Sequence, residues 1–386
     1  MLRGVLARLR AALDVPGRSL RRGVVAVQPS PRLVDWTLFA LVLFEVVSGL
    51  VSFTAGTPAW WPLFWAHRIA GLLFVVFLAF KLARVRYRLT DSDEWQPSTL
   101  LSVLTATAAL GALSTGIAWV FGLDVRIGLW TLLSVHVGFG LALVVLVAAH
   151  VRTRYRPPRR ADFDRRRTSL RYSLLLVAGA VAYRGQELAN WGLGTPGADR
   201  RFTGSQPRAG DGNDSFPITS WVADDPDPID REAWRLRVRG AVDSTLELDY
   251  DAVAGGDPLD GTDAPDAGAE REALLDCTSG WYTVQNWRGI DVGTLLDAAG
   301  VATDARYVRF VSVTGYRWSL PIAEARDALL ATHVGDERLS HGHGAPLRLV
   351  APGRRGFQWV KWIVRIDVRR RPDPAQWVVT LVSGFD

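Results

Sequence analysis

The sequence is poor in two residue types, cysteine and lysine, and each shortage limits what the chain can be. Its single cysteine, Cys277, excludes an intramolecular disulfide and any zinc or iron–sulfur site built from several thiolates. Lysine occurs only at Lys81 and Lys361, so arginine carries almost all of the positive charge. Hydrophobic residues make up 48% and charged residues 22% of the 386 positions, a balance that excludes disordered, collagen-like and coiled-coil proteins.

The net charge changes sign near residue 185. Residues 1–185 hold 23 Lys and Arg against 9 Asp and Glu, whereas residues 186–386 hold 22 against 30, so net charges of +14 and −8 give the overall +6. The positive half also contains the long apolar runs, and its charge therefore does not indicate a soluble nucleic-acid-binding face. We expect a multi-domain protein with a membrane half followed by a soluble half.

Four segments of the first half are long and apolar enough to cross a bilayer, which requires about 20 helical residues. They are Leu33–Phe53, Leu63–Leu82, Thr99–Phe121 and Ile127–Val151. Several arginines lie before the first segment, between the second and the third, and after the fourth. The connection between the first and second segments and that between the third and fourth hold a single arginine in total. This distribution predicts an all-α transmembrane bundle whose two ends face the cytoplasm.

A fifth apolar segment, Tyr172–Tyr183, is short for a membrane span. The stretch before it, Arg166-Arg167-Thr-Ser-Leu-Arg171, resembles a twin-arginine export signal. Alternatively, these arginines are the ordinary basic residues on the cytoplasmic side of a membrane segment. Export would place the soluble half outside the cytoplasm. The predicted organisation is a cytoplasmic N-terminus 1–30, a four-helix cytochrome b-like domain 31–152, a basic linker with the fifth segment 153–187, a flexible linker 188–215 and a soluble domain 216–386.

Histidines inside the predicted spans indicate a haem site. His67 and His136 lie near the same ends of two segments that run in the same direction, so their imidazoles can face each other at one depth. The pattern resembles the di-haem cytochrome b family of four-helix electron carriers. A second haem at His150 would need a ligand at position 81, which is Lys81, so we expect one b haem. Alternatively, each histidine hydrogen-bonds to a neighbouring helix.

The second half combines short strand-like runs with few helical patterns, which predicts an α+β domain. The expected strands are Trp234–Val242, Tyr307–Thr314, Pro346–Ala351, Trp362–Val368 and Trp377–Ser383, and the expected helices are Val292–Ala299 and Ile322–Ala331.

Two motifs in this half resemble the molybdenum-cofactor domain of the sulfite oxidase family. The first is Ala273-Leu-Leu-Asp-Cys277-Thr-Ser-Gly-Trp281 followed by Trp287-Arg-Gly289, and the second runs from His343-Gly-Ala-Pro-Leu-Arg348 to Val360-Lys361-Trp362. The spacing resembles the bacterial periplasmic methionine-sulfoxide reductase branch. Such a domain implies a molybdopterin whose metal takes a cysteine thiolate, the protein ligand that suits this soft centre.

The resemblance implies a role for several residues. Cys277 would bind molybdenum, and Arg348 and Lys361 would bind the anionic pterin cofactor. The other implied cofactor-binding residues are Thr219, Ser220, Ser312, His343, Trp359 and Val360. Tyr316 would be a substrate-side phenol, or would instead pack in the core beside Trp318. The arginine and histidine that sulfite oxidases place near the domain start are missing from Phe216–Trp221, which makes sulfite a less secure substrate.

These patterns predict a membrane-anchored molybdenum oxidoreductase. It would transfer an oxygen atom to or from a small S- or N-oxide or a sulfite-like substrate, and exchange electrons with the quinone pool through the haem. One alternative keeps the helices as an anchor only, with a soluble electron carrier. Another is a non-enzymatic membrane sensor or cofactor-binding scaffold. Membrane lipid and the twin-arginine export machinery are expected partners, and the catalytic domain is expected on the extracytoplasmic side of the cell membrane.

Overall fold

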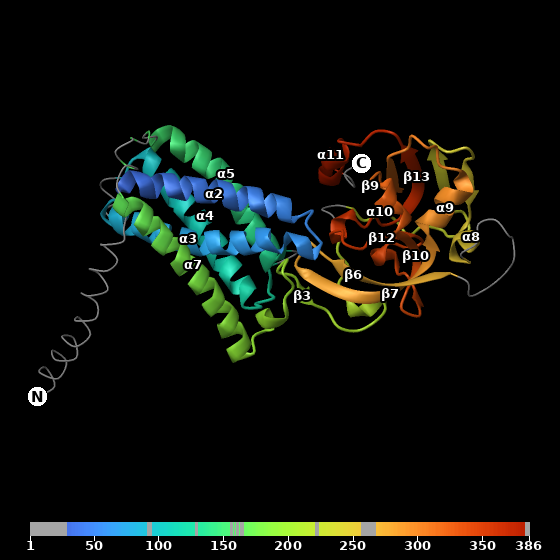
Figure 1. The fold of residues 1–386 in the computed structure, drawn as a ribbon, viewed down its shortest axis with the longest axis horizontal. Helices are drawn as coiled ribbons and strands as arrows, with labels where there is room; N and C mark the ends of the chain where they lie inside the picture. Colours follow the sequence, from blue (N-terminus) through green and yellow to red (C-terminus); the bar gives the residue numbers. More distant parts are fainter. Residues whose placement is uncertain are drawn as a thin grey trace, which may run out of the picture. The chain divides into compact units, whose positions relative to one another are not determined.

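The computed structural model divides the chain into two compact units (Figure 1). It describes residues 29–382 except 91–94, 128–129, 155–156, 158, 160–161, 163–165, 221–223 and 256–267. The helical unit comprises 1–51 and 62–198, and the sheet unit comprises 52–61 and 199–386. The basic N-terminal segment 1–28, part of the basic stretch after the fourth span, Trp221 and most of the acidic loop at 256–267 lie outside the described residues.

Long helices form the helical unit. They are α2 (Pro31–Ser52), α3 (Trp61–Thr90), α4 (Pro97–Val120), α5 (Leu132–Arg154) and α7 (Arg166–Leu193). A short antiparallel hairpin of β1 (Arg126–Ile127) and β2 (Trp130–Thr131) precedes α5, so the fourth predicted span begins as a hairpin and becomes helical only at Leu132. The other three predicted spans lie almost entirely within α2, α3 and α4.

Helix α3 occupies the centre of the helical unit. One apolar cluster joins it to α2, α4 and α5 through Phe74, Leu78 and Leu143 among others. A second cluster joins its opposite side to α2 and α7 through Leu73, Phe77 and Leu175. A Cβ atom at Gly179 of α7 would lie 3.2 Å from the Leu73 side chain, so the glycine permits α7 to approach α3 closely.

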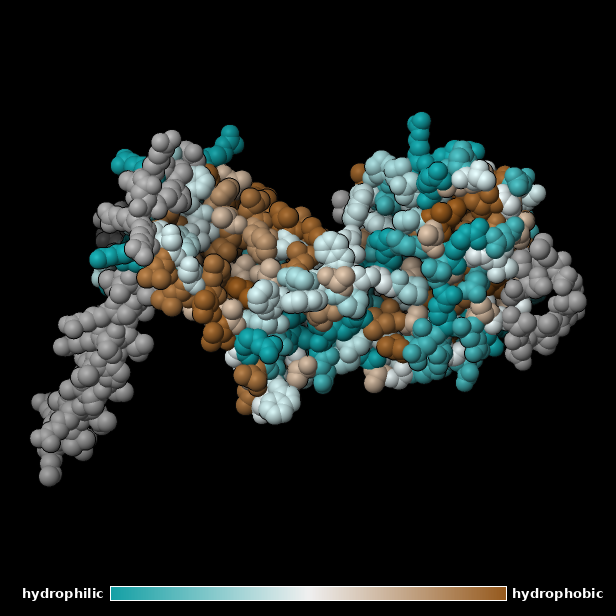
Figure 2. All heavy atoms as spheres, in the orientation of Figure 1, coloured by the Kyte–Doolittle hydropathy of each residue, from teal (hydrophilic) through white to brown (hydrophobic). Residues whose placement is uncertain are grey.

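Four helices of the described chain are long and apolar enough to cross a membrane: Pro31–Ser52, Pro58–Tyr87, Ser98–Val120 and Leu132–Thr153. Large apolar side chains such as Leu43, Leu104 and Val145 are exposed on their outer faces. Hydrophobic residues accordingly cover much of the helical unit's visible surface (Figure 2). Apolar side chains exposed along the outer faces of long helices are typical of helices that contact lipid.

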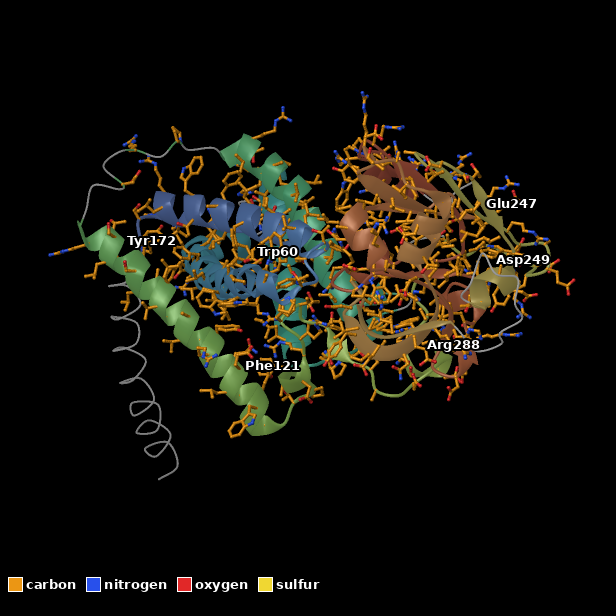
Figure 3. All side chains as sticks on the ribbon, turned by 45° about the vertical axis from the view of Figure 1, so that its right-hand side comes forward. Trp60, Phe121, Tyr172, Glu247, Asp249 and Arg288 are labelled. Atoms are coloured by element: carbon orange, nitrogen blue, oxygen red, sulfur yellow. The ribbon has the colours of Figure 1, made fainter. Side chains whose placement is uncertain are left out.

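The fifth apolar segment lies within α7, which extends it in both directions to 28 residues. The Tyr172 hydroxyl, near the start of α7 (Figure 3), lies 2.5 Å from Thr37 Oγ1 on α2, and the Tyr172 ring stacks on Phe77 with centroids 5.8 Å apart. The twin-arginine-like stretch 166–171 forms the first turns of this helix.

Two sheets make up most of the sheet unit. The first has the order β11-β10-β7-β3, with β12 also paired to β10 and β6 also paired to β7. Its strands are β3 (Gln206–Pro207), β6 (Ala269–Asp276), β7 (Trp281–Asp291), β10 (Leu329–Val334), β11 (Glu337–Arg338) and β12 (Arg348–Val350). All of these pairs are antiparallel except β3 with β7.

The second sheet has the order β5-β4-β13-β8-β9. Its strands are β4 (Leu236–Gly240), β5 (Leu246–Leu248), β8 (Tyr307–Ser312), β9 (Arg317–Pro321) and β13 (Ile363–Arg369), and only the β4–β13 pair is parallel. Short helices α8 (Tyr250–Ala254), α9 (Val292–Ala299), α10 (Ile322–Arg326) and α11 (Gln376–Val382) complete the unit. The predicted pairing of an N-terminal helical region with a C-terminal α+β domain is confirmed.

Two local predictions are wrong. Residues 377–383 were expected to form a strand, but Gln376–Val382 is helix α11, whose Trp377 packs edge-on against Trp318 of β9 with centroids 4.9 Å apart. The predicted helix Ile322–Ala331 ends at Arg326, and Leu329–Ala331 instead begin strand β10, where all three side chains are fully buried. In both places tertiary packing overrides the helix or strand propensity of the local sequence.

The segment 188–215, which we expected to be a flexible linker, contributes to both units. Its first residues complete α7, and β3 pairs in parallel with the start of β7. Ser205 is buried and donates a 2.6 Å hydrogen bond to Asp276. Residues 199–215 are therefore an ordered part of the sheet unit.

Residues 52–61 also belong to the sheet unit, although they connect α2 to α3 in the sequence. Ala55 is buried, and a Cβ atom at Gly56 would lie 2.4 Å from the carbonyl oxygen of Gly353. Arg201 donates a 3.4 Å hydrogen bond to the Gly56 carbonyl. Because only glycine allows this approach, the loop packs directly against the segment that follows β12.

Candidate functional site

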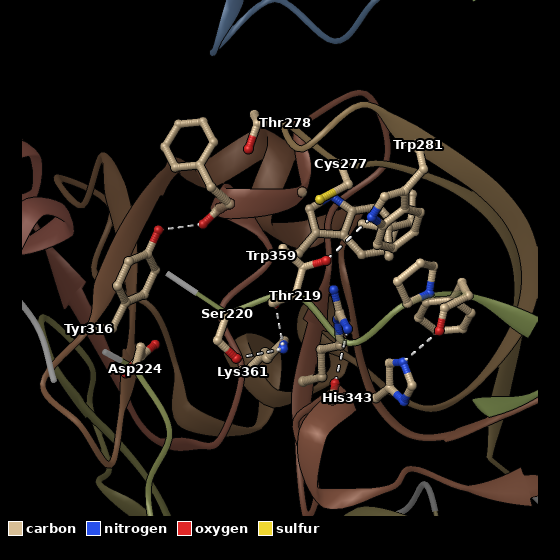
Figure 4. A pocket seen from close by; sticks show the side chains of 16 residues that line it. Thr219, Ser220, Asp224, Cys277, Thr278, Trp281, Tyr316, His343, Trp359 and Lys361 are labelled. Carbon is tan, nitrogen blue, oxygen red and sulfur yellow. Dashed lines mark hydrogen bonds between the residues drawn. The ribbon is translucent and has the colours of Figure 1, made fainter. Parts of the chain in front are cut away.

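A pocket in the sheet unit brings together residues from both sequence motifs (Figure 4). Eight predicted site residues line it: Thr219, Ser220, Cys277, Tyr316, His343, Arg348, Trp359 and Lys361. The others in the lining are Phe216, Pro217, Asp224, Leu275, Thr278, Trp281, Gly356 and Phe357.

Cys277 sits in the tight turn between β6 and β7. Its backbone N–H donates to the Trp281 carbonyl at 2.8 Å, and the Gly280 N–H returns a 3.1 Å bond to the Cys277 carbonyl. Gly280 has a φ of 101°, which favours glycine and explains the Ser-Gly-Trp sequence after the cysteine. The cysteine is 7% exposed, and its sulfur lies 3.1 Å from Ser279 Oγ. The turn thus fixes one thiol at the pocket wall.

Arg348, the first residue of β12, places a buried cation in the same pocket. It is 4% exposed and donates from Nη1 to the His343 carbonyl at 2.9 Å, while its Nε has no hydrogen-bond partner among the described residues. Its guanidinium carbon lies 5.5 Å from the ring centroid of Trp287 and 5.9 Å from that of Trp359. Burial lowers the pKa of Arg348 to about 10, so the side chain stays charged at neutral pH.

Lys361 supplies a second cation. Its ammonium donates to the carbonyl of Thr219 at 2.8 Å and to that of Gly342 at 2.6 Å, and lies 3.5 Å from Ser220 Oγ. Burial and the nearby Arg348 charge lower the pKa of Lys361 to about 7. An anion in the pocket would oppose this shift and keep the lysine protonated.

His343 is a structural neighbour of these cations. Its Nε2 lies 3.2 Å from the Phe216 carbonyl and its Nδ1 lies 2.8 Å from Ser340 Oγ. Burial and the charge of Arg348 lower the pKa of His343 to about 4, so the ring is neutral at pH 7. Because a carbonyl can only accept, Nε2 carries the proton and Nδ1 accepts from the Ser340 hydroxyl. His343 therefore fixes the Phe216 segment beside Arg348.

Tyr316 reaches the pocket from the turn before β9. Its hydroxyl donates a 2.6 Å hydrogen bond to the Phe357 carbonyl, and burial raises the pKa of this phenol. Ser312 and Val360, also predicted to bind the cofactor, are buried but are not among the residues that line the pocket. Ser312 Oγ instead accepts hydrogen bonds from the Thr314 backbone and hydroxyl.

Sequence reasoning missed two charged residues of this region. Asp224 lines the pocket, and Arg355 donates from Nη2 to the Cys277 carbonyl at 3.2 Å. Asp224 is followed by Asp225, and the sequence does not indicate which of the two is buried. Arg355 directly follows Arg354, but the structure separates the two: Arg354 pairs with Glu324, whereas Arg355 is buried beside Asp276.

In the helical unit, the His67 and His136 rings lie with centroids 6.4 Å apart and planes at 82°. His67 Nδ1 lies 2.9 Å from Glu45 Oε2 and 2.8 Å from Ser48 Oγ, and His136 Nδ1 lies 2.8 Å from the Ala112 carbonyl. A proton on each Nδ1 leaves the Nε2 lone pair available to a metal. In bis-imidazole ligation the ring centroids are separated by two metal–nitrogen bonds of about 2 Å and by the radii of the two rings. This sum is close to the centroid separation of His67 and His136, so the distance between the rings fits such ligation.

The geometry around the other membrane histidine is different. His150 Nδ1 lies 3.5 Å from Ser102 Oγ, and Lys81, at the position where a second haem would need its ligand, forms a 2.8 Å ion pair with Asp35. Among the described residues, no three His, Cys, Asp or Glu side chains come together as a metal site.

Comparison with known proteins identifies the sheet unit. Residues 223–377 match the family model of the oxidoreductase molybdopterin binding domain. This part of the chain is a molybdopterin-binding oxidoreductase domain. It contains Cys277, Arg348 and Lys361, and the resemblance to the sulfite oxidase family is confirmed.

Two curated relatives match this molybdopterin-binding domain. An uncharacterized oxidoreductase, YuiH, from Bacillus subtilis (strain 168) is 29% identical over 166 residues, which are 42% of this chain and 78% of YuiH. The protein-methionine-sulfoxide reductase catalytic subunit MsrP from Burkholderia mallei (strain ATCC 23344) is 29% identical over 161 residues, which are 37% of this chain and 46% of MsrP. The chain thus spans less than half of MsrP.

A solved structure, the sulfane dehydrogenase SoxCD from Paracoccus pantotrophus, aligns over 37% of this chain and 40% of that chain at 22% identity. The TM-score of 0.33 is too low to support any conclusion about shared function.

The pocket residues fit a molybdopterin. A fully buried guanidinium with a free Nε is costly unless an anion completes its hydrogen bonds. The phosphate of a pterin cofactor would supply that anion, and the Cys277 thiol faces the same pocket. A soft thiolate and a cationic wall are the two features that such a cofactor requires.

Proposed function

We propose that the chain is a membrane-anchored oxidoreductase whose molybdenum is bound by the Cys277 thiolate. The observation that carries this proposal is that the only thiol of the chain and the buried, incompletely bonded Arg348 line one pocket of a molybdopterin-binding domain. When bound, the molybdopterin supplies two-electron oxygen-atom exchange with a small S- or N-oxide or a sulfite-like substrate.

The chain's own residues would hold and orient this cofactor. Arg348 and Lys361 provide charge-assisted hydrogen bonds to its phosphate. Thr219, Ser220 and His343 arrange the segment that closes the pocket around Lys361 and Arg348. Trp359 covers the guanidinium and is itself fixed by a 3.2 Å bond from its indole N–H to the Arg354 carbonyl.

Three further predicted residues take supporting places. Val360, which stands between Trp359 and Lys361 in the sequence, is buried. Ser312 holds the Thr314 turn from which Tyr316 enters the pocket. We propose Tyr316 as a phenol that orients substrate, since its hydroxyl is at the pocket wall opposite the turn that carries Cys277.

For the helical unit we propose electron transfer. His67 and His136 would hold one b haem, which supplies a one-electron carrier when bound. The Nδ1 contacts and the ring separation of these histidines support this proposal. We further propose that the helices cross the cell membrane, that electrons exchange with the quinone pool, and that the twin-arginine-like segment directs the molybdopterin-binding domain to the extracytoplasmic side.

Metal and haem quantification on the detergent-solubilised protein tests both parts. We expect close to one molybdenum and one haem per chain, and Cys277→Ser should lose oxygen-atom transfer and weaken molybdenum retention. His67→Ala and His136→Ala should each abolish the b-type absorption band, whereas the control His150→Ala should keep it. A protein free of molybdenum, isolated from a host well supplied with the metal, would refute the catalytic proposal.

The alternative in which the helices are only an anchor makes a separate prediction. In that case the protein would contain molybdenum without a b-type band, and a soluble carrier would reduce or oxidise it. Reoxidation of the reduced haem by a candidate oxide, at a rate that depends on Cys277, would exclude this alternative.

A further inference from the structure

One acid in the pocket has no part in cofactor binding as proposed. Asp224 is the only carboxyl group among the described residues that line the pocket. It is 6% exposed, and its Oδ1 has no hydrogen-bond partner among the described residues. Figure 4 shows Asp224 near the ring of Tyr316, on the side of the pocket that also holds Ser220 and Lys361.

The groups that face Asp224 favour its protonated form. Burial raises the pKa of Asp224, the negative Asp225 adds to this effect, and the Thr314 hydroxyl and the Lys361 ammonium oppose only part of it. The Tyr316 phenol is uncharged at neutral pH, and burial raises its pKa further. An uncharged carboxyl with a free oxygen can both hold a proton and release it to a nearby acceptor.

Reduction of an S-oxide needs such a group. The substrate R–S(=O)–R′ takes up two electrons and two protons, its S–O bond breaks, sulfur is reduced and the oxygen leaves as water. In the proposed function the electrons come from the quinone pool through the helical unit. The protons must come from residues at the pocket or from water that reaches it.

Three other titratable groups of the pocket are already engaged in hydrogen bonds to protein. The Tyr316 hydroxyl donates to the Phe357 carbonyl at 2.6 Å. His343 is neutral, and both of its nitrogens are hydrogen-bonded to protein. Lys361 donates to two carbonyl oxygens. Asp224 Oδ1 has no hydrogen-bond partner among the described residues, and this distinguishes Asp224 from these three groups.

We propose that Asp224 is the acid that delivers protons to the departing oxygen atom when the domain reduces an uncharged S- or N-oxide. This inference rests on the proposed function. It assigns a role to a residue that neither sequence motif contains, and it implies that the enzyme works as a reductase.

The matched pair Asp224→Asn and Asp225→Asn tests the inference, because Asp225 is the exposed neighbour and both changes replace a carboxyl group by an amide. The full chain is reduced with a viologen dye, and dimethyl sulfoxide or trimethylamine N-oxide is the oxidant. Asp224→Asn should lower kcat by about 100-fold or more at unchanged molybdenum content, because general acid catalysis contributes about 100-fold to 10,000-fold. Asp225→Asn should stay within about twofold of wild type, and Asp224→Glu should recover part of the rate.

An infrared measurement gives a readout that does not need turnover. The wild type and Asp225→Asn should show a protonated carboxyl band that persists to higher pH than that of an ordinary aspartic acid and that Asp224→Asn lacks, in protein with or without cofactor. The inference is overturned if Asp224→Asn keeps the wild-type rate and pH profile, if its loss of rate merely follows loss of molybdenum, or if the band is absent from the wild type. A wild type without molybdenum would instead refute the proposed function, and the infrared result would still decide the protonation of Asp224.

Discussion

Arg355 Nη1 lies 3.0 Å from Asp276 Oδ1, and both side chains are almost completely buried. Asp276 directly precedes Cys277, and Arg355 also donates from Nη2 to the Cys277 carbonyl. Thr203 and Ser205 donate to the two oxygens of the same carboxylate at 2.9 and 2.6 Å. The ion pair and the bond to the Cys277 carbonyl therefore fix the backbone at Cys277.

Removal of one partner of this pair should destabilise the molybdopterin-binding domain strongly. Asp276→Asn leaves the Arg355 charge buried without a carboxylate, and breaking such a pair costs about 3–5 kcal/mol. The unfolding midpoint of the solubilised protein should fall by several degrees, and molybdenum content should fall with it because the Cys277 backbone is no longer fixed.

Arg354 provides the control for this prediction. Its ion pair with Glu324 is partly exposed, so Arg354→Gln should change the stability by less than about 1 kcal/mol. Equal losses in Asp276→Asn and Arg354→Gln would contradict the structural role given to the buried pair.

Lys361 should give the cofactor-free domain a characteristic pH dependence. The pKa is about 7 in the folded state and near 10.5 when unfolded, so the unfolded chain binds more protons between these values. The contribution of this residue therefore raises stability as pH increases from about 7 to 10. Lys361→Met should remove that increase, as measured by unfolding midpoints of cofactor-free protein across this range.

Bound molybdopterin should reverse the trend. Its phosphate favours the protonated lysine, so cofactor retention should weaken as pH rises above 7 in the wild type. In Lys361→Arg the side chain stays charged, and retention should depend less on pH. Identical pH profiles for the wild type and Lys361→Arg would argue against a contact between Lys361 and the anion.

Gly116 of α4 should be essential to the geometry of the histidine pair. A Cβ atom there would lie 3.0 Å from Cε1 and 3.1 Å from Nδ1 of His136, so Gly116→Val should displace the ring and lower haem content. A Cβ atom at Gly140, on the same helix as His136, would have no atom of the described residues within 4 Å outside its own helix backbone, and Gly140→Ala should bind haem as the wild type does. The measurement is the b-type absorption band per unit of protein.

Glu45 should influence the electron affinity of the haem that we propose between His67 and His136. A carboxylate that accepts the His67 Nδ1 proton makes the ring a stronger ligand and stabilises the oxidised iron. Glu45→Gln should raise the midpoint potential of the haem without abolishing the b-type band. A spectroelectrochemical titration that finds an unchanged or lower potential would contradict this assignment.

The parts of this protein that could be predicted are those with a strong local signal. The helix Val292–Ala299 was predicted with its observed bounds because its apolar positions repeat at helical spacing and Gly300, at a φ of 67°, ends it. The Cys277 motif was recognised by its resemblance to the sulfite oxidase family, which is carried by the order of residues 273–281 around the cysteine. Both features depend on neighbours in the sequence.

The misses depend on contacts between distant residues. Trp377–Val382 has β-favouring side chains, but the segment packs beside the edge strand β9, where Gln376 accepts a hydrogen bond from the Ser319 N–H. Asp224 and Asp225 are adjacent and identical, yet one is buried in the pocket and the other is exposed. No property of the local sequence separates the members of that pair, because burial is decided by the fold.

The loop of residues 52–61 makes the molybdopterin-binding domain discontinuous along the gene. A fragment that starts at residue 199 would lack residues 52–61. Gly353 and Arg201 would then lose their contacts with Gly56. No single break in the coding sequence separates the two halves cleanly.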